Sequence, residues 1–460
     1  MHLSRHVVAA AGAVTSPTMP TAPLRILALL LLVLNYAPSI QAQSPLRAGP
    51  MLGYNTMREV AVWVQTREAA DVGLRYWPVS DVRDLHYSTF AKTSEQSAYC
   101  ATLIADSLAP GITYEYQVLI DDRALTTGEA LRFTTPTNYA YRTEPPEFTF
   151  ALGSCYYANE PAYDRPGKAY GGEYGIFQEI DSLQPDLMLW LGDNIYLRPG
   201  DFDSRSGVLH RYSHSRSIPE LRGLLRSAHH YAIWDDHDYG PNDSDRSYPY
   251  KAWTREAFDL FWANPESSHE QLAGTNATGF RYHDAEFFML DNRSKRAPNA
   301  CTTCEQMPLL GDDQLDWLID ALVSSTASYK FVLIGGQVLN PARVWENYAH
   351  HHGKERRRLL ERIEAEGIKN VVFLTGDRHH TELSKLARGE TTLYDFTVSP
   401  LTSGATDRNK DEGNTLRVPG TFVGQRNFGT VTLSGPFNER LATLRIYDAT
   451  GKLLWERVLD

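Results

Sequence analysis

The sequence is poor in cysteine and carries no excess of positive charge. Four cysteines in 460 residues allow at most two disulfides, which is few for a chain of this length. Residues 43–460 hold 43 basic residues against 56 acidic ones, a net charge of −13. A chain of this charge is a poor candidate for a general nucleic-acid binder. The remaining composition, 42% hydrophobic and 22% charged, is ordinary for a soluble globular protein, and we find no internal repeat or low-complexity segment.

Near the N-terminus the sequence also lacks an apolar run long enough to cross a membrane. Residues 26–34 form a nine-residue apolar run after Arg25, and a polar stretch follows them. About 20 apolar residues are needed to span a bilayer, whereas this order is typical of a secretory signal peptide over residues 1–42. No twin-arginine pair precedes the run, and no cysteine stands just after residue 42, which favours general secretion over a lipoprotein anchor. We therefore expect a secreted or periplasmic protein with no transmembrane segment after cleavage, and Met19 is an alternative start of translation.

The four cysteines fall into one close pair and two separate positions. Cys301 and Cys304 stand three residues apart in CTTC, a spacing that indicates a short disulfide or, as an alternative, half of a zinc site that lacks a second pair. Cys100 and Cys155 remain. They can bond to each other, or Cys155 can have a different role at the end of a strand.

The first part of the mature chain has a residue pattern typical of a β-sandwich. Short apolar and alternating runs separated by turn residues predict strands at residues 60–65, 72–77, 101–108 and 113–120. We expect an Ig-like or fibronectin-like domain over residues 43–136, then a polar linker over residues 137–146.

Strands alternate with helices in the rest of the chain, which predicts an α/β catalytic domain over residues 147–460. Amphipathic patterns predict helices at residues 174–183, 252–263, 312–324 and 354–366. Polar stretches predict long loops at residues 197–221, 241–250 and 400–420. The tail returns to strands at residues 429–433, 441–447 and 453–458.

Polar side chains follow the predicted strands of this domain, at the point where each strand ends. The buried runs occupy residues 148–152, 187–191, 231–234, 286–290, 331–334 and 371–374. Ligands bind outside the carboxyl ends of the strands in open α/β sheets, so these side chains should converge on one site.

Three of these strand ends carry residues that bind metals. Asp193 and Tyr196 stand three apart in GDNIY, Asp236 precedes His237, and Asp377 and His379 alternate in GDRHH. Oxygen ligands mixed with imidazoles suit a dinuclear site for divalent or trivalent cations, of the kind that supports in-line attack on phosphorus. Asp235 and Asp238 compete with Asp236 for this role, and we favour Asp236 because it stands directly before His237.

Five motifs in this order resemble the alkaline phosphatase D (PhoD-like) family of metallophosphoesterases. They are GSCYY at residues 153–157, LGDNIY at 191–196, WDDHD at 234–238, GDRHH at 376–380 and DFTVSPLTSG at 395–404. The resemblance extends from about residue 47 to residue 460. It implies an αββα sandwich that carries the site, preceded by the small β-sandwich domain.

The resemblance also implies the roles of single residues. Cys155 resembles a thiolate ligand and Tyr196 a phenolate ligand of a ferric ion, Asp193 resembles a carboxylate that bridges two metals, and the further ligands would be Asp236, Asp377 and His379. The family pairs iron with calcium, and other divalent metals remain open.

Further residues near these motifs are candidates for contact with the phosphate or for support of the ligands. His237 is expected to face the phosphate and to hydrogen-bond it or protonate the leaving group, and Asn242 to contact the phosphate through its amide. Gln337 stands where related phosphatases carry a histidine motif, so its role as ligand or supporting donor stays open. Arg198 and Arg378 can neutralise a phosphate. His380 and the run 350–352 are expected to face solvent or to belong to a lid.

These observations predict a secreted, metal-dependent phosphoester hydrolase of the alkaline phosphatase D type, in which a hydroxide generated at the metals attacks phosphorus in line. Its substrate would be a small-molecule or lipid phosphoester, and we expect a monomer. Two alternatives stay open: a phosphodiesterase that acts on diesters, including phospholipids, and a non-catalytic protein that binds phosphate or a glycan.

Overall fold

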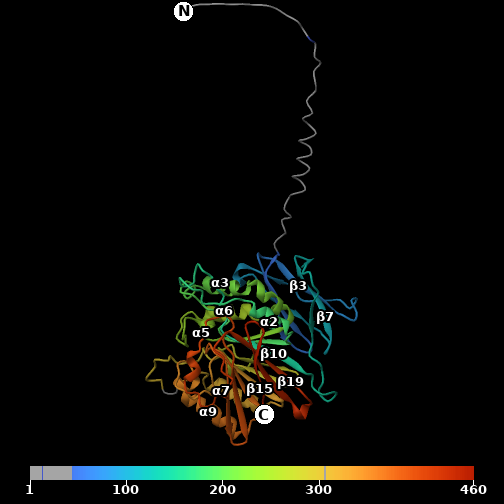
Figure 1. Ribbon diagram of the computed structural model, residues 1–460. Helices are drawn as coiled ribbons and strands as arrows, with labels where there is room; N and C mark the ends of the chain where they lie inside the picture. The colour runs from blue at the N-terminus through green and yellow to red at the C-terminus, as the bar shows by residue number, and fades with distance from the viewer. Residues whose placement is uncertain (1–12, 14–43, 305–306, 460) are drawn as a thin grey trace, which may run out of the picture. The chain divides into compact units, whose positions relative to one another are not determined.

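The computed structural model describes residue 13, residues 44–304 and residues 307–459 (Figure 1). The chain divides into two compact units, Met1–Ser44 and Pro45–Asp460, and all the described residues except residue 13 and Ser44 belong to the second. The predicted signal peptide and the alternative start at Met19 lie outside the described residues. Within the described residues, no helix combines the length and apolar character needed to cross a membrane.

Two large sheets form the centre of the second unit. The first has nine strands, in the order β21 (Leu453–Val458), β20 (Leu441–Asp448), β19 (Asn427–Ser434), β10 (Phe148–Gly153), β11 (Leu187–Leu191), β12 (His229–Ile233), β1 (Leu46–Asn55), β2 (Val60–Thr66) and β6 (Cys100–Ala105). The second has six, in the order β13 (Thr278–Tyr282), β14 (Ala285–Met289), β15 (Tyr329–Ile334), β16 (Val371–Thr375), β18 (Thr391–Thr397) and β17 (Glu382–Arg388). Strands β10, β11 and β12 are parallel to one another, and so are β14, β15, β16 and β18, whereas β10 pairs with β19 in the antiparallel sense.

The two sheets pack face to face through aromatic and aliphatic side chains. Phe150 on β10 lies edge-on against Phe287 on β14 and Phe331 on β15, with ring centroids 5.4 and 5.0 Å apart. All five residues of β11 and of β12 are buried, as expected for strands covered on both faces. The continuous apolar runs in the sequence therefore correspond to the centre of this double layer.

Helices cover the outer face of each sheet, so the predicted αββα arrangement is confirmed (Figure 1). The helices over the nine-stranded sheet are α2 (Ile176–Ser182), α3 (Arg205–Arg216), α4 (Arg222–Ser227) and α6 (Lys251–Phe261). The six-stranded sheet is covered by α7 (Asp312–Ser324) and α9 (Gly353–Ala365), whose apolar faces are buried against it. Two short helices, α5 (Asp236–Tyr239) and α8 (Tyr348–His351), lie in the connections.

The N-terminal β-sandwich shares one of its layers with the nine-stranded sheet. Strands β1, β2 and β6 continue that sheet, because β1 pairs in parallel with β12 through Leu52 and His229. The opposite layer contains β3 (Asp71–Pro78), β7 (Thr113–Ile120) and β9 (Leu131–Thr134), flanked by the short strands β4 (His86–Tyr87), β5 (Ala91–Lys92) and β8 (Arg123–Ala124). A separate apolar cluster lies between the two layers. The boundaries at residues 136 and 146 stay a prediction.

The loop predicted at residues 197–221 is wrong, because this segment contains α3. Ser204 caps the start of the helix by accepting a hydrogen bond from the backbone of Gly207. The buried face of α3 includes Arg211, whose guanidinium binds Asp201 and Glu160 at 2.9 and 2.7 Å. Two serines and a second arginine are buried on the same helix beside its apolar residues, so no clear apolar periodicity marks it in the sequence.

The cysteine alternatives are also resolved. Cys301 and Cys304 form the predicted disulfide, which excludes the zinc alternative for that pair. Cys100 and Cys155 are both buried and free, so the alternative that they bond to each other is wrong.

Candidate metal centre

The candidate residues lie where the parallel strands of both sheets end, and two glycines allow the sheets to approach each other there. A Cβ on Gly376 would lie 2.6 Å from the carbonyl oxygen of Leu191, and one on Gly335 would lie 2.4 Å from Cγ of Asp235. Gly376 and Gly335 follow strands of one sheet, whereas Leu191 and Asp235 belong to the other. The glycines at these strand ends therefore bring the two sets of polar side chains within reach of each other.

Four of the predicted ligands have a backbone in the left-handed region. Their φ angles are 60° at Cys155, 52° at Asp193, 64° at Asp377 and 55° at His379. Side chains other than glycine adopt this region at a cost, and such residues concentrate at functional sites. An unfavourable backbone conformation at these four residues thus orients their side chains toward the site.

A first group of donors contains a sulfur, a carboxylate, a phenol and an imidazole. Oδ2 of Asp193 lies 3.5 Å from Sγ of Cys155 and accepts a hydrogen bond from the Tyr196 hydroxyl at 3.1 Å. The same hydroxyl lies 3.5 Å from Nε2 of His379. Ligand atoms of Cys155, Asp193 and His379 lie within 4.8 Å of one another.

A second group is made of carboxylates. Ligand atoms of Asp235, Asp236 and Asp377 lie within 4.8 Å of one another, and so do those of Asp193, Asp236 and His237. Asp193 therefore belongs to the first group and also contacts the second. All six predicted metal ligands are brought together at this edge of the sheets.

The three aspartates of WDDHD have different surroundings, which bears on their competition for the site. Asp235 forms a buried ion pair with Arg293 at 2.5 Å and accepts a hydrogen bond from Asn292. Asp238 accepts the backbone N–H groups of Asp235 and Asn194, both at 3.0 Å. Among the described residues, Oδ1 of Asp236 and Oδ2 of Asp235 are both buried without a hydrogen-bond partner. The surroundings therefore set Asp238 apart from the other two, and the choice of Asp236 over Asp235 stays a prediction.

The titration behaviour of the site reflects crowded negative charge. Burial, reinforced by Cys155 and Asp236, raises the pKa of Asp193 well above its usual range. Burial, followed by the charge of Asp235, raises the pKa of Asp377 to about 7, and burial raises the pKa of the Cys155 thiol to about 11. Burial also acts to raise the pKa of Asp236, but the charges of His237 and Arg293 outweigh it, and that pKa is lowered. Buried acids so close together need a positive partner to ionise together, and this donor set fits metal ions.

A cavity of about 570 Å³ opens over these groups. Asp193, Asp236, Asp377 and His379 line it, together with the predicted catalytic residues His237 and Asn242. The His237 ring packs on Tyr196 with centroids 4.1 Å apart, and burial lowers the pKa of His237. A molecule in this cavity would therefore meet a neutral imidazole and an amide beside the carboxylates.

Comparison with known proteins agrees with this arrangement. The family model described as PhoD-like phosphatase matches residues 150–433, which is more than half of the chain. The chain belongs to the PhoD-like phosphatase family. The resemblance predicted from the five motifs is thereby confirmed, and all five lie within the matched range.

Further matches extend the similarity beyond the PhoD-like region. A model of a domain of unknown function, DUF7800, matches residues 43–138. Alkaline phosphatase D of Bacillus subtilis is 24% identical over 365 residues, which are 67% of this chain and 59% of that relative. The match thus spans less than two thirds of the curated relative. A solved structure named PhoD superposes with a TM-score of 0.73 at 19% identity and covers 92% of this chain and 94% of its own, which shows a shared fold.

The prediction that His380 faces solvent is wrong in this PhoD-like chain. The side chain of His380 is fully buried, with Nε2 3.7 Å from Glu382 and 3.9 Å from Glu412. Within the run 350–352, His352 is also buried and its Nδ1 bonds to the carbonyl of Met307 at 2.8 Å, whereas His350 and His351 are half-buried. The burial of both histidines depends on segments distant in the sequence, which a local pattern cannot show.

Gln337 and the two arginines are held by their own neighbours. The Gln337 amide donates to Glu382 at 2.7 Å and to Thr397 at 3.0 Å, so it supports the buried network around Glu382 and belongs to neither donor group. Arg198 is buried, binds Asp164 at 2.8 Å and stacks over Tyr157, so it does not line the cavity. Arg378 binds Glu412 at 2.6 Å and also lines the cavity, so its role toward a phosphate stays a prediction.

Sequence reasoning missed Arg293, which holds the carboxylates in place. Its guanidinium is buried and contacts Asp235 at 2.5 Å, Glu346 at 2.8 Å and Asp236 at 3.7 Å. Arg293 stands two residues after Asp291, just past the end of β14. The strand-end rule that located the aspartates could therefore have found it.

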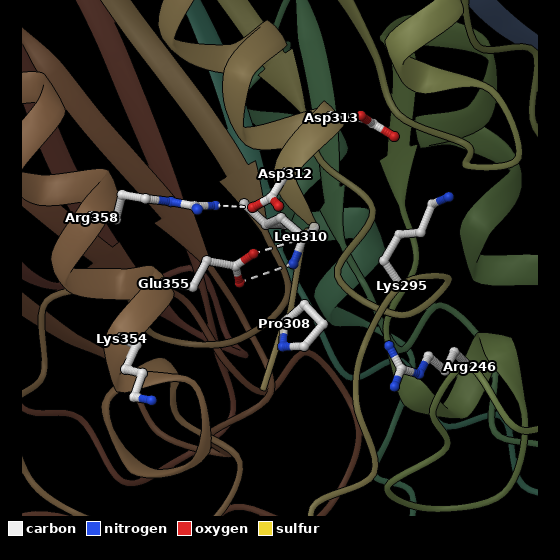
Figure 2. A pocket seen from close by; sticks show the side chains of 10 residues that line it. Arg246, Lys295, Pro308, Leu310, Asp312, Asp313, Lys354, Glu355 and Arg358 are labelled. Carbon is white, nitrogen blue, oxygen red and sulfur yellow. Dashed lines mark hydrogen bonds and ion pairs between the residues drawn. The ribbon is translucent and has the colours of Figure 1, made fainter. Parts of the chain in front are cut away.

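A larger cavity, of about 910 Å³, lies elsewhere on the molecule (Figure 2). Three of its charged side chains hold the local structure: Glu355 accepts the backbone N–H groups of Leu309, Leu310 and Gly311, and Arg358 pairs with Asp312. No member of the two donor groups lines it. The candidate metal ligands lie at the smaller cavity.

Proposed function

We propose that this protein is a secreted or periplasmic, metal-dependent phosphoester hydrolase. The observation that carries the proposal is the meeting of two donor groups at Asp193, on the floor of a cavity that also contains His237. Family membership supports the same reaction class, because the matched family is one of phosphatases.

We propose different cations for the two groups, because their donor atoms differ. Thiolate and phenolate are both anionic and bind a trivalent ion strongly, so Cys155, Tyr196, Asp193 and His379 would hold ferric iron. Carboxylates alone suit a hard cation such as calcium, which Asp193, Asp236 and Asp377 would hold. When bound, such cations polarise phosphoryl oxygens and supply a nucleophilic water near neutral pH.

Side chains beside the metal ligands would bind the phosphate and the leaving oxygen. His237 is half-exposed to the cavity, and its ring is fixed by packing on Tyr196. As a neutral imidazole it can donate one N–H to the leaving oxygen or to a phosphoryl oxygen as charge develops there. Asn242 would donate its amide to another phosphoryl oxygen, and Arg378 adds positive charge at the wall of the cavity.

Hydrolysis of nitrophenyl phosphate and of bis-nitrophenyl phosphate, measured side by side with and without chelator, tests the proposal. Chelator-sensitive turnover of at least one ester is the expected result, and the ratio of the two rates assigns a monoesterase or a phosphodiesterase. Turnover that chelator leaves unchanged contradicts the metal-dependent mechanism. Binding of phosphate without any turnover would instead support a binding protein.

A further inference from the structure

Trp345 is a large aromatic side chain left open to solvent beside the candidate metal centre. It is 53% exposed, whereas Trp63, Trp190 and Trp234 are fully buried. Trp345 lines the same cavity as Asp236 and His237. Exposed tryptophans are uncommon and are enriched where proteins bind other molecules.

Hydrogen bonds connect Trp345 to the metal centre. Its indole Nε1 donates to Oδ2 of Asp243 at 2.9 Å, and the backbone N–H of Asp243 donates to Oδ2 of Asp236 at 2.8 Å. The carbonyl of Trp345 accepts a hydrogen bond from Arg378 at 3.1 Å. Two hydrogen bonds therefore place the indole next to a candidate ligand.

The neighbouring residue fixes the backbone that presents the ring. Glu346 has a φ of 66° and a buried carboxylate that pairs with Arg293 at 2.8 Å and with Arg296 at 2.7 Å. The indole also packs edge-on against His351, with ring centroids 4.9 Å apart and an interplanar angle of 87°. A ring fixed in this way loses little conformational freedom when a ligand binds.

The chemistry around Trp345 favours one kind of ligand. Its only polar atom already bonds to Asp243, so the exposed part of the indole offers apolar, aromatic surface. Carboxylates and two arginines, Arg378 and Arg408, line the same cavity, so the charge of the lining does not by itself select the head group. The selection comes from the exposed aromatic surface beside the proposed phosphate site, which fits a flat ring joined to a phosphate.

We propose that Trp345 forms a subsite that stacks on a planar aromatic or heteroaromatic ring in the leaving group of the phosphoester. This inference rests on the proposed phosphoesterase function and narrows its substrate class. Trp345 is thus a specificity-determining residue, which acts on binding of the leaving group and not on the reacting atoms.

Adenosine 5′-monophosphate and ribose 5-phosphate test the subsite, because they share the same leaving oxygen and differ by the base. Stacking on an aromatic side chain strengthens binding of a base by a factor of about ten or more. We expect Trp345→Ala to lower kcat/KM for the nucleotide about tenfold more than for the sugar phosphate, chiefly through KM. Trp345→Phe should restore most of the difference. Tyr141→Ala, a matched change at a fully exposed aromatic outside the cavity, should leave both values unchanged.

Binding of both ligands to the metal-loaded protein is also measured by calorimetry. This measurement distinguishes the absence of a subsite at Trp345 from the absence of phosphoester hydrolysis. Selective binding of the nucleotide that Trp345→Ala removes, in a protein without turnover, would support the subsite and overturn the hydrolase. Equal losses for the two ligands in an active enzyme would overturn the subsite and leave the hydrolase intact. A loss confined to a long-chain alkyl phosphate, assayed in parallel, would also overturn it, because an acyl chain would then be the occupant.

Discussion

The hydroxyl of Tyr196 donates a hydrogen bond to Oδ2 of Asp193 at 3.1 Å, across a single turn at the end of β11. The Cys155 sulfur lies 3.5 Å from the same carboxylate oxygen. Burial is the main cause that raises the pKa of all three groups. A cation that binds here must displace their protons, so metal affinity should rise with pH.

Replacing Tyr196 with Phe tests the iron assignment. A phenolate bound to ferric iron absorbs visible light through charge transfer from the ligand to the metal. We expect the iron-loaded protein to be coloured and Tyr196→Phe to lose or strongly shift this band. Tyr157→Phe is the matched control, because Tyr157 packs on Tyr196 but its hydroxyl bonds to Asp164. An unchanged spectrum in Tyr196→Phe would remove the phenolate from the ligand set.

Replacing His237 with Asn tests the role of the imidazole at the leaving oxygen. Loss of a general acid or hydrogen-bond donor costs about 100-fold or more, and poor leaving groups depend on it most. We therefore expect kcat to fall much further for an alkyl phosphate than for nitrophenyl phosphate. His86→Asn, on the surface of the β-sandwich, should leave both rates unchanged. Equal losses for the two substrates would contradict donation by His237 to the leaving oxygen.

Local sequence patterns predicted the residues at the strand ends well, and they predicted contacts between distant segments poorly. Asp193 and Asp377 each follow a continuous apolar strand, so their position at the edge of a sheet could be predicted from neighbouring residues alone. The pairing of Leu52 with His229 joins segments far apart in the chain, and no local pattern encodes it. The helix around Arg211 and the burial of His380 were missed for a related reason, since polar partners stabilise both.

Replacing Arg293 with Gln tests whether Arg293 stabilises the buried carboxylates around it. The change leaves the buried carboxylates of Asp235 and Glu346 without their shared charged partner. We expect the free energy of unfolding to fall by about 3–5 kcal/mol, as for other broken buried ion pairs. Arg132→Gln, which breaks an exposed pair with Glu115, should cost less than about 1 kcal/mol. Denaturant unfolding of the two variants compares them, and similar losses would contradict the role of Arg293.

The stability of the fold should fall in mild acid through His229, which lies where β12 meets β1. Burial lowers its pKa to about 4, against about 6.5 in an unfolded chain. The unfolded chain therefore binds the proton more tightly, so this contribution is complete above about pH 6.5 and is lost as pH falls toward 4. At pH 5 the loss amounts to about 2 kcal/mol.

The variant His229→Gln isolates this effect, because glutamine does not titrate and can still bond to the carbonyl of Gly53, which His229 contacts at 2.9 Å. Free energies of unfolding at pH 7.5 and pH 5 provide the measurement. The parent protein should lose about 2 kcal/mol more than the variant between these two conditions. The same pH dependence in both proteins would show that His229 is protonated in the folded state.

In the proposed mechanism, Asp193 is shared by two metal sites on which hydrolysis depends. The most direct measurement is the metal content of Asp193→Asn together with its turnover of nitrophenyl phosphate. The control is Asp186→Asn, the same substitution just before the opposite end of β11, where Asp186 accepts the Thr149 backbone N–H at 2.9 Å. We predict that Asp193→Asn loses metal and falls at least about 100-fold in activity, whereas Asp186→Asn keeps both. Full metal content and full turnover in Asp193→Asn would contradict the account.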